Sequence, residues 1–397
     1  MTAAIADLRG YEILDSRGQP TIFTTCVLTD GTEKSVSVPS GRSTGRWEAH
    51  ELRDGDPDRF DGRGCLQAID GINSLIRAEL IGMPVSDQAG LDGRMIELDG
   101  TGNRSRLGAN AMLSVSLAAC RAAARSSGVE LWQYLAAMAN NEAPGLPRLT
   151  VNLLSGGLHA GQQVPVQDVL LVPVAAASVE ESLVAVSDVF SAAVGLSTSR
   201  YGARLLTADE GGLAPPFRST DEMLDFAVAA IVASGQEERM RLAVDVAASH
   251  LTGGRGYQFE GRSLTGRMMI EEIRGWLSRY PIVSIEDGLD QDDWGHWSDL
   301  TALIGDSTLV VGDDLLCTQT SRVQRAIEED AANALLIKPN QVGTVTEALL
   351  AMQTARRAGW PVVASARSGE TEDDWLADLA VGWSADFIKV GSITQSD

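Results

Sequence analysis

Five short apolar runs in the second half of the chain each end on a charged side chain, and this pattern constrains the fold more than any other feature. The runs are Leu242–Asp245, Ile282–Glu286, Leu309–Asp313, Ala334–Lys338 and Asp386–Lys389. Short apolar runs are typical of strands that are buried on both faces of a parallel sheet. When such strands close into a barrel, their carboxyl ends meet at one mouth. The sequence therefore predicts three carboxylates and two ammonium groups around one barrel mouth, which is the layout of an enzyme.

The chain is long enough for such a barrel and a second, smaller domain. It has 397 residues, whereas a strand–helix barrel takes about 250. Residues 1–130 are expected to form an α+β domain, with a hairpin over 21–38 and a helix over 105–126 capped by Ser105. Residues 140–397 alternate apolar runs with amphipathic stretches, which predicts the barrel domain. The amphipathic stretches are 179–196, 220–233, 268–279, 320–330 and 345–358.

Composition excludes several classes of protein. The net charge of −22 argues against a nucleic-acid partner, because phosphates require a basic face, and against an anionic membrane surface. An anionic small substrate stays possible, because metal ions and a few cations can reverse the potential inside one cleft. No uninterrupted run reaches the roughly 18 apolar residues of a membrane span, and no secretory signal is visible. Four scattered cysteines are expected to be reduced and buried, as in a cytoplasmic protein.

The three acids of the barrel mouth predict a divalent-metal site. Asp245, Glu286 and Asp313 are spaced by about one strand–helix unit each. Carboxylate oxygens are the ligands that Mg²⁺ prefers, with waters and substrate completing the shell. The alternative is that each acid merely caps the following helix. Three acids in register favour the metal site.

Two lysines end strands of the same set. Burying an ammonium group is costly without partners, so Lys338 and Lys389 must face something anionic. Beside carboxylates and a metal ion, one lysine can act as a base while the other pairs with substrate charge. The alternative is a pair of structural salt bridges to the acids.

Loops around this mouth supply further candidates. Glu210 lies on a glycine-flanked turn, where repulsion from neighbouring acids would raise its pKa and suit a general acid. His159 and the pair Gln167–Asp168 supply polar groups on nearby loops. A lone histidine in such a loop is as often structural as catalytic.

A cationic loop follows the apolar run that begins at Pro361. Arg367 and Ser368 combine a guanidinium fork with a hydroxyl, which suits a phosphoryl or carboxylate group. Ser43 and Thr44, in a loop of the N-terminal domain, are positioned to close over the same group as a lid. The alternative is an ordinary solvated loop.

These motifs occur together, in order, in one family. The chain resembles enolase over nearly its whole length. The segments that carry the resemblance are Ile13–Gly18, Val38–Gly45, Glu97–Thr101, Ser105–Ala111, Asp209–Gly212, Asp245–Ser249, Ser284–Asp287, Gly312–Leu315, Lys338–Gly343 and Arg367–Asp373. The resemblance implies an α/β enolase fold: a modified TIM-type (β/α)8 barrel with an N-terminal α+β capping domain. It also implies a homodimer or higher homo-oligomer, and Mg²⁺-dependent conversion of 2-phosphoglycerate to phosphoenolpyruvate.

The resemblance also implies residue roles. It implies that Asp245, Glu286 and Asp313 bind the first Mg²⁺ and that Ser43 helps to bind the second. Lys338 would remove the C2 proton, and Glu210 would assist departure of hydroxide. Lys389 would hold the carboxylate, and Arg367 and Ser368 would hold the phosphoryl group. Candidate substrate-binding groups beside them are His159, Gln167, Asp168 and Arg42. Enolase-type sites with a Lys base and Mg²⁺ are themselves a standard example of this chemistry.

Four departures from the family pattern affect the choice of reaction. Ala366 replaces a histidine, Asp168 replaces a glutamate, Arg42 replaces a small residue, and the sequence stops at Asp397 before a terminal helix that the family adds. The three substitutions surround the leaving group and the phosphoryl end. They favour a specialised paralogue, such as carboxyphosphonoenolpyruvate synthase of phosphonate or phosphinate antibiotic biosynthesis, acting on a phosphonyl carboxylate. The alternatives are an ordinary enolase and a non-catalytic binding protein of the same fold.

Overall fold

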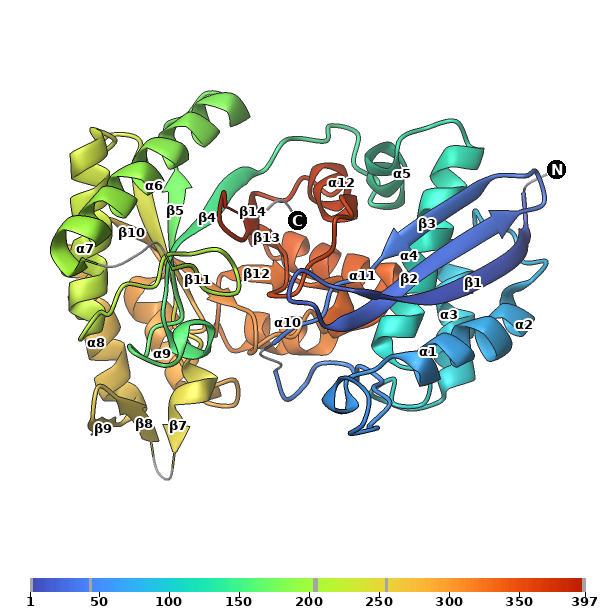
Figure 1. The fold of residues 1–397 in the computed structure, drawn as a ribbon, viewed down its shortest axis with the longest axis horizontal. Helices are drawn as coiled ribbons and strands as arrows, with labels where there is room; N and C mark the ends of the chain where they lie inside the picture. The colour runs from blue at the N-terminus through green and yellow to red at the C-terminus, as the bar shows by residue number, and fades with distance from the viewer. Residues whose placement is uncertain (1–2, 43–44, 203–205, 254–255, 395–397) are drawn as a thin grey trace.

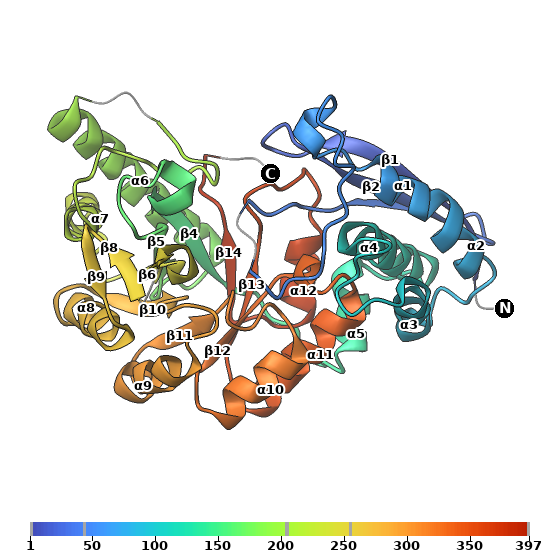
Figure 2. The same cartoon turned by 90° about the horizontal axis from the view of Figure 1, so that it is seen from below.

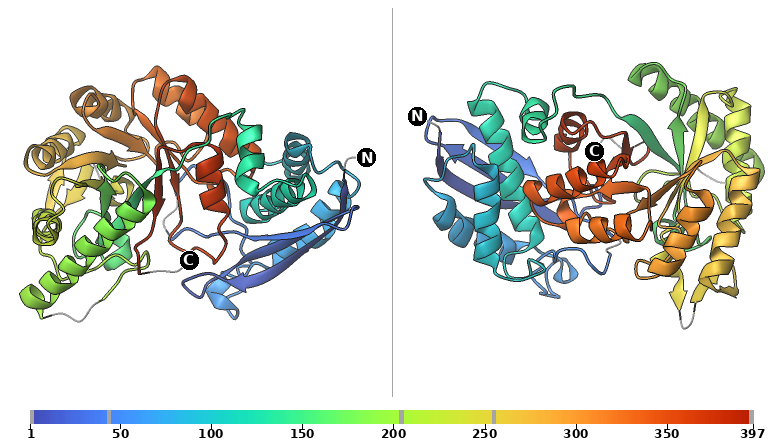
Figure 3. Two further views of the ribbon diagram at one scale, coloured as in Figure 1. Left: turned by 90° about the horizontal axis from the view of Figure 1, so that it is seen from above. Right: turned by 180° about the vertical axis from the view of Figure 1, so that it is seen from behind.

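The computed structural model describes residues 3–42, 45–202, 206–253 and 256–394. An N-terminal α+β unit lies beside a barrel that is ringed by helices (Figure 1). Figure 3 shows the segment between α5 and β4 crossing from the first unit to the second. The predicted fold class, a barrel with an N-terminal α+β domain, is confirmed.

The N-terminal unit is a three-stranded antiparallel sheet covered by helices. Its elements are β1 (Ile5–Leu14), β2 (Pro20–Leu28), β3 (Glu33–Ser37), η1 (Phe60–Gly62), α1 (Leu66–Gly71), the π-helical turn η2 (Ile72–Ile76), α2 (Arg77–Leu80), α3 (Gln88–Asp99), α4 (Ala109–Ser126) and α5 (Leu131–Met138). The predicted hairpin is β2–β3. The helix predicted from Ser105 begins four residues later, because the Asp99 carboxylate accepts the backbone N–H groups of Arg106 and Leu107 and keeps them in a turn.

Helix α4 joins the two units. Almost every residue of α4 is buried. On the sheet side, the Ser114 hydroxyl lies 2.8 Å from that of Thr24. On the barrel side, the Ser116 hydroxyl accepts the N–H of Val345 at 3.0 Å, at the start of α11. Small side chains along α4 let both neighbours approach closely, so the N-terminal unit is packed firmly against the barrel.

The barrel is closed by eight strands in the order β10-β11-β12-β13-β14-β4-β5-β6. Their bounds are β4 (Arg148–Ser155), β5 (Asp168–Pro173), β6 (Met240–Asp245), β10 (Ile282–Glu286), β11 (Leu309–Gly312), β12 (Ala334–Ile337), β13 (Val362–Ser365) and β14 (Phe387–Val390). The predicted strands are thus present to within two residues at each end. The barrel departs from a wholly parallel one at a single strand, because β5 runs antiparallel to both β4 and β6.

Helices surround these strands on the outside, as Figure 2 shows from below. Their bounds are α6 (Val179–Tyr201), α7 (Thr220–Ser234), α8 (Gly266–Arg279), α9 (Trp294–Ile304), α10 (Thr320–Glu328), α11 (Val345–Arg357) and α12 (Trp375–Gly382). Shorter elements are η3 (Gly157–Ala160), η4 (Ala248–Leu251), η5 (Pro339–Gln341) and a small sheet of β7 (Thr252–Gly253), β8 (Gly256–Phe259) and β9 (Arg262–Leu264). Within the described residues, α6 alone has the length and composition to cross a membrane, and one of its faces packs on α7, β4 and β5.

Candidate active site

The charged residues that end the predicted strands meet at one barrel mouth. The parallel pairing of β6 with β10 places Asp245 directly beside Glu286. Asp313 and Lys338 each lie one residue beyond β11 and β12, and Lys389 lies inside β14, paired in register with Ser365 of β13. All three acids and Lys389 are less than a tenth exposed. The mouth is therefore a buried ionic site.

Both lysines are bonded to these acids. The Lys389 ammonium donates to Asp245 Oδ2 at 2.8 Å and to the two oxygens of Glu286 at 2.6 and 2.7 Å. The Lys338 ammonium donates to Asp313 Oδ2, whose other oxygen accepts the Gln341 amide at 2.7 Å. The salt-bridge arrangement considered for the lysines is thus the one in this structure, while their roles toward substrate and metal stay predictions.

Burial and charge oppose each other at these groups. Burial would raise the pKa of Asp245, but the Lys389 ammonium beside it holds that pKa below its usual range. At Asp313, Lys338 does the same. Burial together with repulsion from Asp245 raises the pKa of Glu286 well above its usual range. Even with the two ammonium groups present, the three carboxylates lack enough neighbouring positive charge to keep Glu286 readily ionised. This shortage favours binding of a further cation.

A second cluster lies beside the first and involves the reversed strand, whose Asp168 pairs in register with Asp245. Because β5 runs against its neighbours, its first residue, Asp168, stands at the mouth. Its carboxylate accepts from Asn152 Nδ2 and Ser155 Oγ, both at 2.7 Å, and lies 3.0 Å from His159 Nδ1. His159 Nε2 lies 3.7 Å from Glu210 Oε1.

This second cluster sets the protonation of two predicted groups. Burial lowers the pKa of His159, but the charges of Asp168 and Glu210 outweigh burial and raise it to about 9. The imidazole is therefore charged at neutral pH and donates from Nδ1 to Asp168. Burial is the main cause that raises the pKa of Glu210, whereas His159 lowers it. The sequence predicted the direction for Glu210 from repulsion between acids, and the structure gives burial as the larger cause.

The predicted phosphoryl-binding pair is bonded to protein groups. Arg367 donates to both carboxylate oxygens of Glu48, at 3.0 and 3.3 Å, and to Asn340 Oδ1 at 2.8 Å. The Ser368 hydroxyl accepts from Arg17 Nη1 at 3.1 Å. Glu48, from the N-terminal unit, was not predicted, because a distant acid in a loop gives no periodic signal.

The loop of the N-terminal unit reaches the barrel at the same place. Its residue Ser40 exchanges backbone hydrogen bonds with Gly369, at 2.9 and 3.1 Å. Arg42 donates its N–H to Ser368 Oγ at 2.8 Å, and its guanidinium forms an ion pair with Asp209, next to Glu210. Arg42, predicted to bind substrate, thus ties the loop to the barrel. Ser43, the predicted second-metal ligand, lies outside the described residues.

A small cavity joins these groups. It is lined by His159, Gln167, Glu210, Asp245, Lys338, Ser365, Ala366, Arg367, Ser368, Lys389, Val390 and Gly391 and has a volume of about 20 Å³. This volume holds about one water molecule. His159 Nε2 and Gln167 Oε1 are buried without a hydrogen-bond partner among the described residues. Because buried polar atoms are normally satisfied, these two fit a polar group in the cavity, either a water molecule or part of a ligand.

Among the residues that the structure describes, two trios of acidic or histidine side chains are compact enough for a metal ion. They are His159, Asp168 and Glu210, and Asp287, Asp313 and Asp314. The predicted trio of Asp245, Glu286 and Asp313 is more open, because the Lys389 ammonium lies between the first two. Asp287 was not predicted, and its oxygens accept the N–H groups of Asp313 and Asp314 at 3.0 and 2.8 Å, which shapes the loop after β11.

A barrel mouth with buried acids, two lysines and shifted pKa values is typical of an acid–base enzyme. Residues 5–135 match the family profile described as enolase, N-terminal domain, and residues 144–397 match enolase, C-terminal TIM barrel domain. The chain is 44% identical over 402 residues to Enolase 1 of Methylococcus capsulatus, covering 100% of this chain and 94% of that protein. The chain belongs to the enolase family.

It is an enolase-like lyase, which argues against the non-catalytic hypothesis. Enolases generally use Mg²⁺ and act on a small phosphorylated carboxylate, and the acidic groups of this mouth include sets that could hold a metal ion.

Proposed function

We propose that this chain removes water from 2-phosphoglycerate to give phosphoenolpyruvate, the ordinary reaction of its family. One observation carries the proposal: the partly buried Lys338, the partly buried carboxyl group of Glu210 and the buried His159 line the same small cavity. Removal of a C2 proton and departure of a C3 hydroxide need a base and an acid that both reach the substrate. The full-length likeness to a protein named Enolase 1 supports the same reaction.

We assign the base to Lys338 and the acid to Glu210. Glu210 has a raised pKa because it is buried, so it can keep the proton that the leaving hydroxide needs. The Lys338 ammonium is paired with Asp313, which raises its pKa against the effect of burial. Lys338 must therefore lose this partner before it can accept a proton. His159, charged beside Glu210, is positioned to orient the acid or the hydroxyl.

The donor set at the mouth fits Mg²⁺. Asp245, Glu286 and Asp313 offer only carboxylate oxygens, and the Lys389 ammonium between two of them shows that their oxygens can share one cation. A bound Mg²⁺ would supply positive charge for the carboxylate of the substrate as that group becomes an enolate dianion. A second ion at Ser43, a homodimer and a cytoplasmic location stay predictions.

Substrate must replace existing protein contacts. A cavity of about 20 Å³ cannot hold a phosphorylated three-carbon acid. We assign the substrate carboxylate to Lys389 and the phosphoryl group to Arg367 and Ser368. Arg367 would then exchange part of its bond to Glu48 for the phosphoryl oxygens. Separation of Arg42 from Asp209 is the motion that would open the cavity from the N-terminal side.

A second candidate function is the specialised reaction on a phosphonyl carboxylate that the sequence favoured. Ala366 lines the cavity where the family resemblance expects a histidine, and Arg42 adds a cation next to the lining residue Ser368. Asp168 is one methylene shorter than the expected glutamate. The comparisons favour the ordinary reaction, because the full chain aligns with a protein named Enolase 1.

Phosphorus NMR separates the two reactions. The protein is mixed with Mg²⁺ and 2-phosphoglycerate, and then with a phosphonoformyl donor as well. Formation of phosphoenolpyruvate without the donor supports the ordinary reaction, whereas product only with the donor supports the second. Lys338→Met should lower the rate at which the C2 proton exchanges with deuterium by about 10²- to 10⁴-fold. Undiminished exchange in that variant would refute the assignment of the base.

Arg42→Ala tests the specificity. If Arg42 binds an extra anionic group of the substrate, replacing Arg42 should raise KM for the phosphonate-modified substrate more than for 2-phosphoglycerate. Arg46→Ala is a matched control, because Arg46 lies in the same loop and pairs with Asp292 rather than with Asp209. Equal effects of Arg42→Ala on both substrates would show that the guanidinium recognises nothing distinctive.

A further inference from the structure

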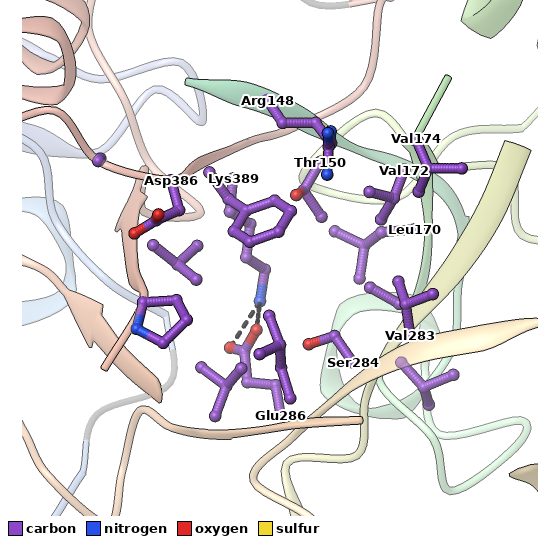
Figure 4. A pocket seen from close by; sticks show the side chains of 18 of the residues that line it. Arg148, Thr150, Leu170, Val172, Val174, Val283, Ser284, Glu286, Asp386 and Lys389 are labelled. Carbon is purple, nitrogen blue, oxygen red and sulfur yellow. Dashed lines mark hydrogen bonds and ion pairs between the residues drawn. The ribbon is translucent and has the colours of Figure 1, made fainter. Parts of the chain in front are cut away.

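A second, larger cavity lies inside the barrel, toward the amino ends of its strands. Its volume is about 640 Å³, within the range of small-molecule pockets. Apolar side chains from opposite walls line it. Among them are Leu170, Val172 and Val283 (Figure 4), together with Ala243, Val311 and Phe387. Eight-stranded barrels normally fill this space with layers of side chains. This barrel is therefore less filled than its strand number predicts.

The packing of the walls explains the space. Leu170, Val172 and Ala243 form one small apolar cluster, and Val311 belongs to another on the opposite wall. Phe387 is partly buried and packs against both clusters. Because the two clusters do not interdigitate into one core, an apolar slot remains between them.

The two ends of this slot differ in charge. At the inner end the Lys389–Glu286 ion pair separates it from the site at the mouth. At the outer rim stands the exposed Arg148, whose guanidinium carbon lies 5.8 Å from the centre of the Phe387 ring. No hydrogen bond or ion pair joins the Arg148 guanidinium to another residue that the structure describes. Asp386, at the same rim, pairs instead with Arg356 at 2.7 Å.

We propose that this slot binds a linear, amphipathic monocarboxylate of the medium-chain fatty-acid class. The carboxylate would pair with Arg148 at the rim, and the alkyl chain would lie between the apolar walls. Thr150 and Ser284 line the same cavity, and their hydroxyls can hydrogen-bond water molecules beside the alkyl chain (Figure 4). This site is distinct from the proposed reaction site, and its ligand meets the Lys389–Glu286 pair from the opposite side.

Calorimetric titration with hexanoate, octanoate and decanoate tests the apolar part of the proposal. Each added methylene that enters the slot should tighten binding about fourfold. Octanol, which lacks the charge, should bind about two- to fivefold more weakly than octanoate. An affinity that does not grow with chain length, or no binding of octanoate at millimolar concentration, would overturn the proposal.

Two kinds of variant locate the ligand. Arg148→Gln should remove the preference for octanoate over octanol. Arg200→Gln should leave it unchanged, because Arg200 is likewise exposed over a phenyl ring, 5.6 Å from that of Phe226, but lies away from the slot. Ala243→Leu should abolish binding by filling the slot, and Val283→Phe serves if Ala243→Leu does not fold. A preference for octanoate that survives in Arg148→Gln would refute the placement of the carboxylate.

Discussion

Replacing Asp168 by asparagine should lower the pKa of His159 strongly. The two side chains are almost fully buried and lie 3.0 Å apart. At that distance, with an effective dielectric constant near 20, two unit charges attract by roughly 5 kcal/mol, and one pKa unit corresponds to about 1.4 kcal/mol. Glu210 would still attract the imidazolium, so we expect a fall of at least about two units from the value of about 9.

The chain has four histidines, so each imidazole can be followed by NMR as the pH is raised in metal-free protein. Ser155→Ala is the control, because it removes a hydrogen bond to the same carboxylate and keeps the charge. His159 in that variant should titrate close to its wild-type value. A wild-type His159 that titrates near 6.5, or an unchanged pKa in Asp168→Asn, would refute the reasoning.

The same shift predicts how stability depends on pH. The pKa of His159 is raised in the folded protein, to about 9, above the value of about 6.5 in an unfolded chain. Its contribution to the free energy of unfolding is therefore full below about pH 6.5 and is lost as the pH rises through 9. Urea unfolding between pH 6 and 9.5 should show this loss in the wild type and a flatter profile in Asp168→Asn.

Two further substitutions test contacts between the units. Gly41→Ala would place a Cβ atom 1.9 Å from Arg367 Nη2, so KM for the phosphorylated substrate should rise about tenfold; Gly102→Ala, which meets nothing within 4 Å, should leave KM unchanged. Asp92→Ala leaves the partly buried backbone N–H and hydroxyl of Thr346, in α11, without their acceptor, and urea unfolding should show a loss of about 2 to 4 kcal/mol. The exposed Asp70→Ala should cost less than about 0.5 kcal/mol, and equal losses in the two variants would contradict this account.

The apolar runs predicted the strands well because buried parallel strands require continuous apolar sequence. The same signal could not give the direction of β5, since an apolar run reads alike in both directions. That direction decides the site, because it brings Asp168 to the mouth from the first residue of its strand. The start of α4 was also missed, because the Asp99 carboxylate, ten residues earlier, competes for the backbone N–H groups.

Within the site, the residue types predicted the chemistry but not which side chains form hydrogen bonds or ion pairs with one another. Strand ends predicted where Lys338 and Lys389 lie, but their bonds to Asp313 and Glu286 depend on side-chain reach across the barrel. The partner of Arg42, Asp209, lies in a distant loop without periodicity. Pairing between long side chains on different loops is set by tertiary packing, which sequence periodicity does not encode.

The burial of α4 on both sides has a consequence for synthesis of the chain. One face of α4 is covered by β2 and β3. The other face is covered by η5 and α11, which are synthesised much later, since α11 begins at Val345. From Ser126, at the end of α4, the ribosome must add roughly 220 residues, which takes about 10 to 40 s. During that interval a nascent chain would display an apolar helix surface, and so it is a natural client for chaperones that hold unfinished proteins.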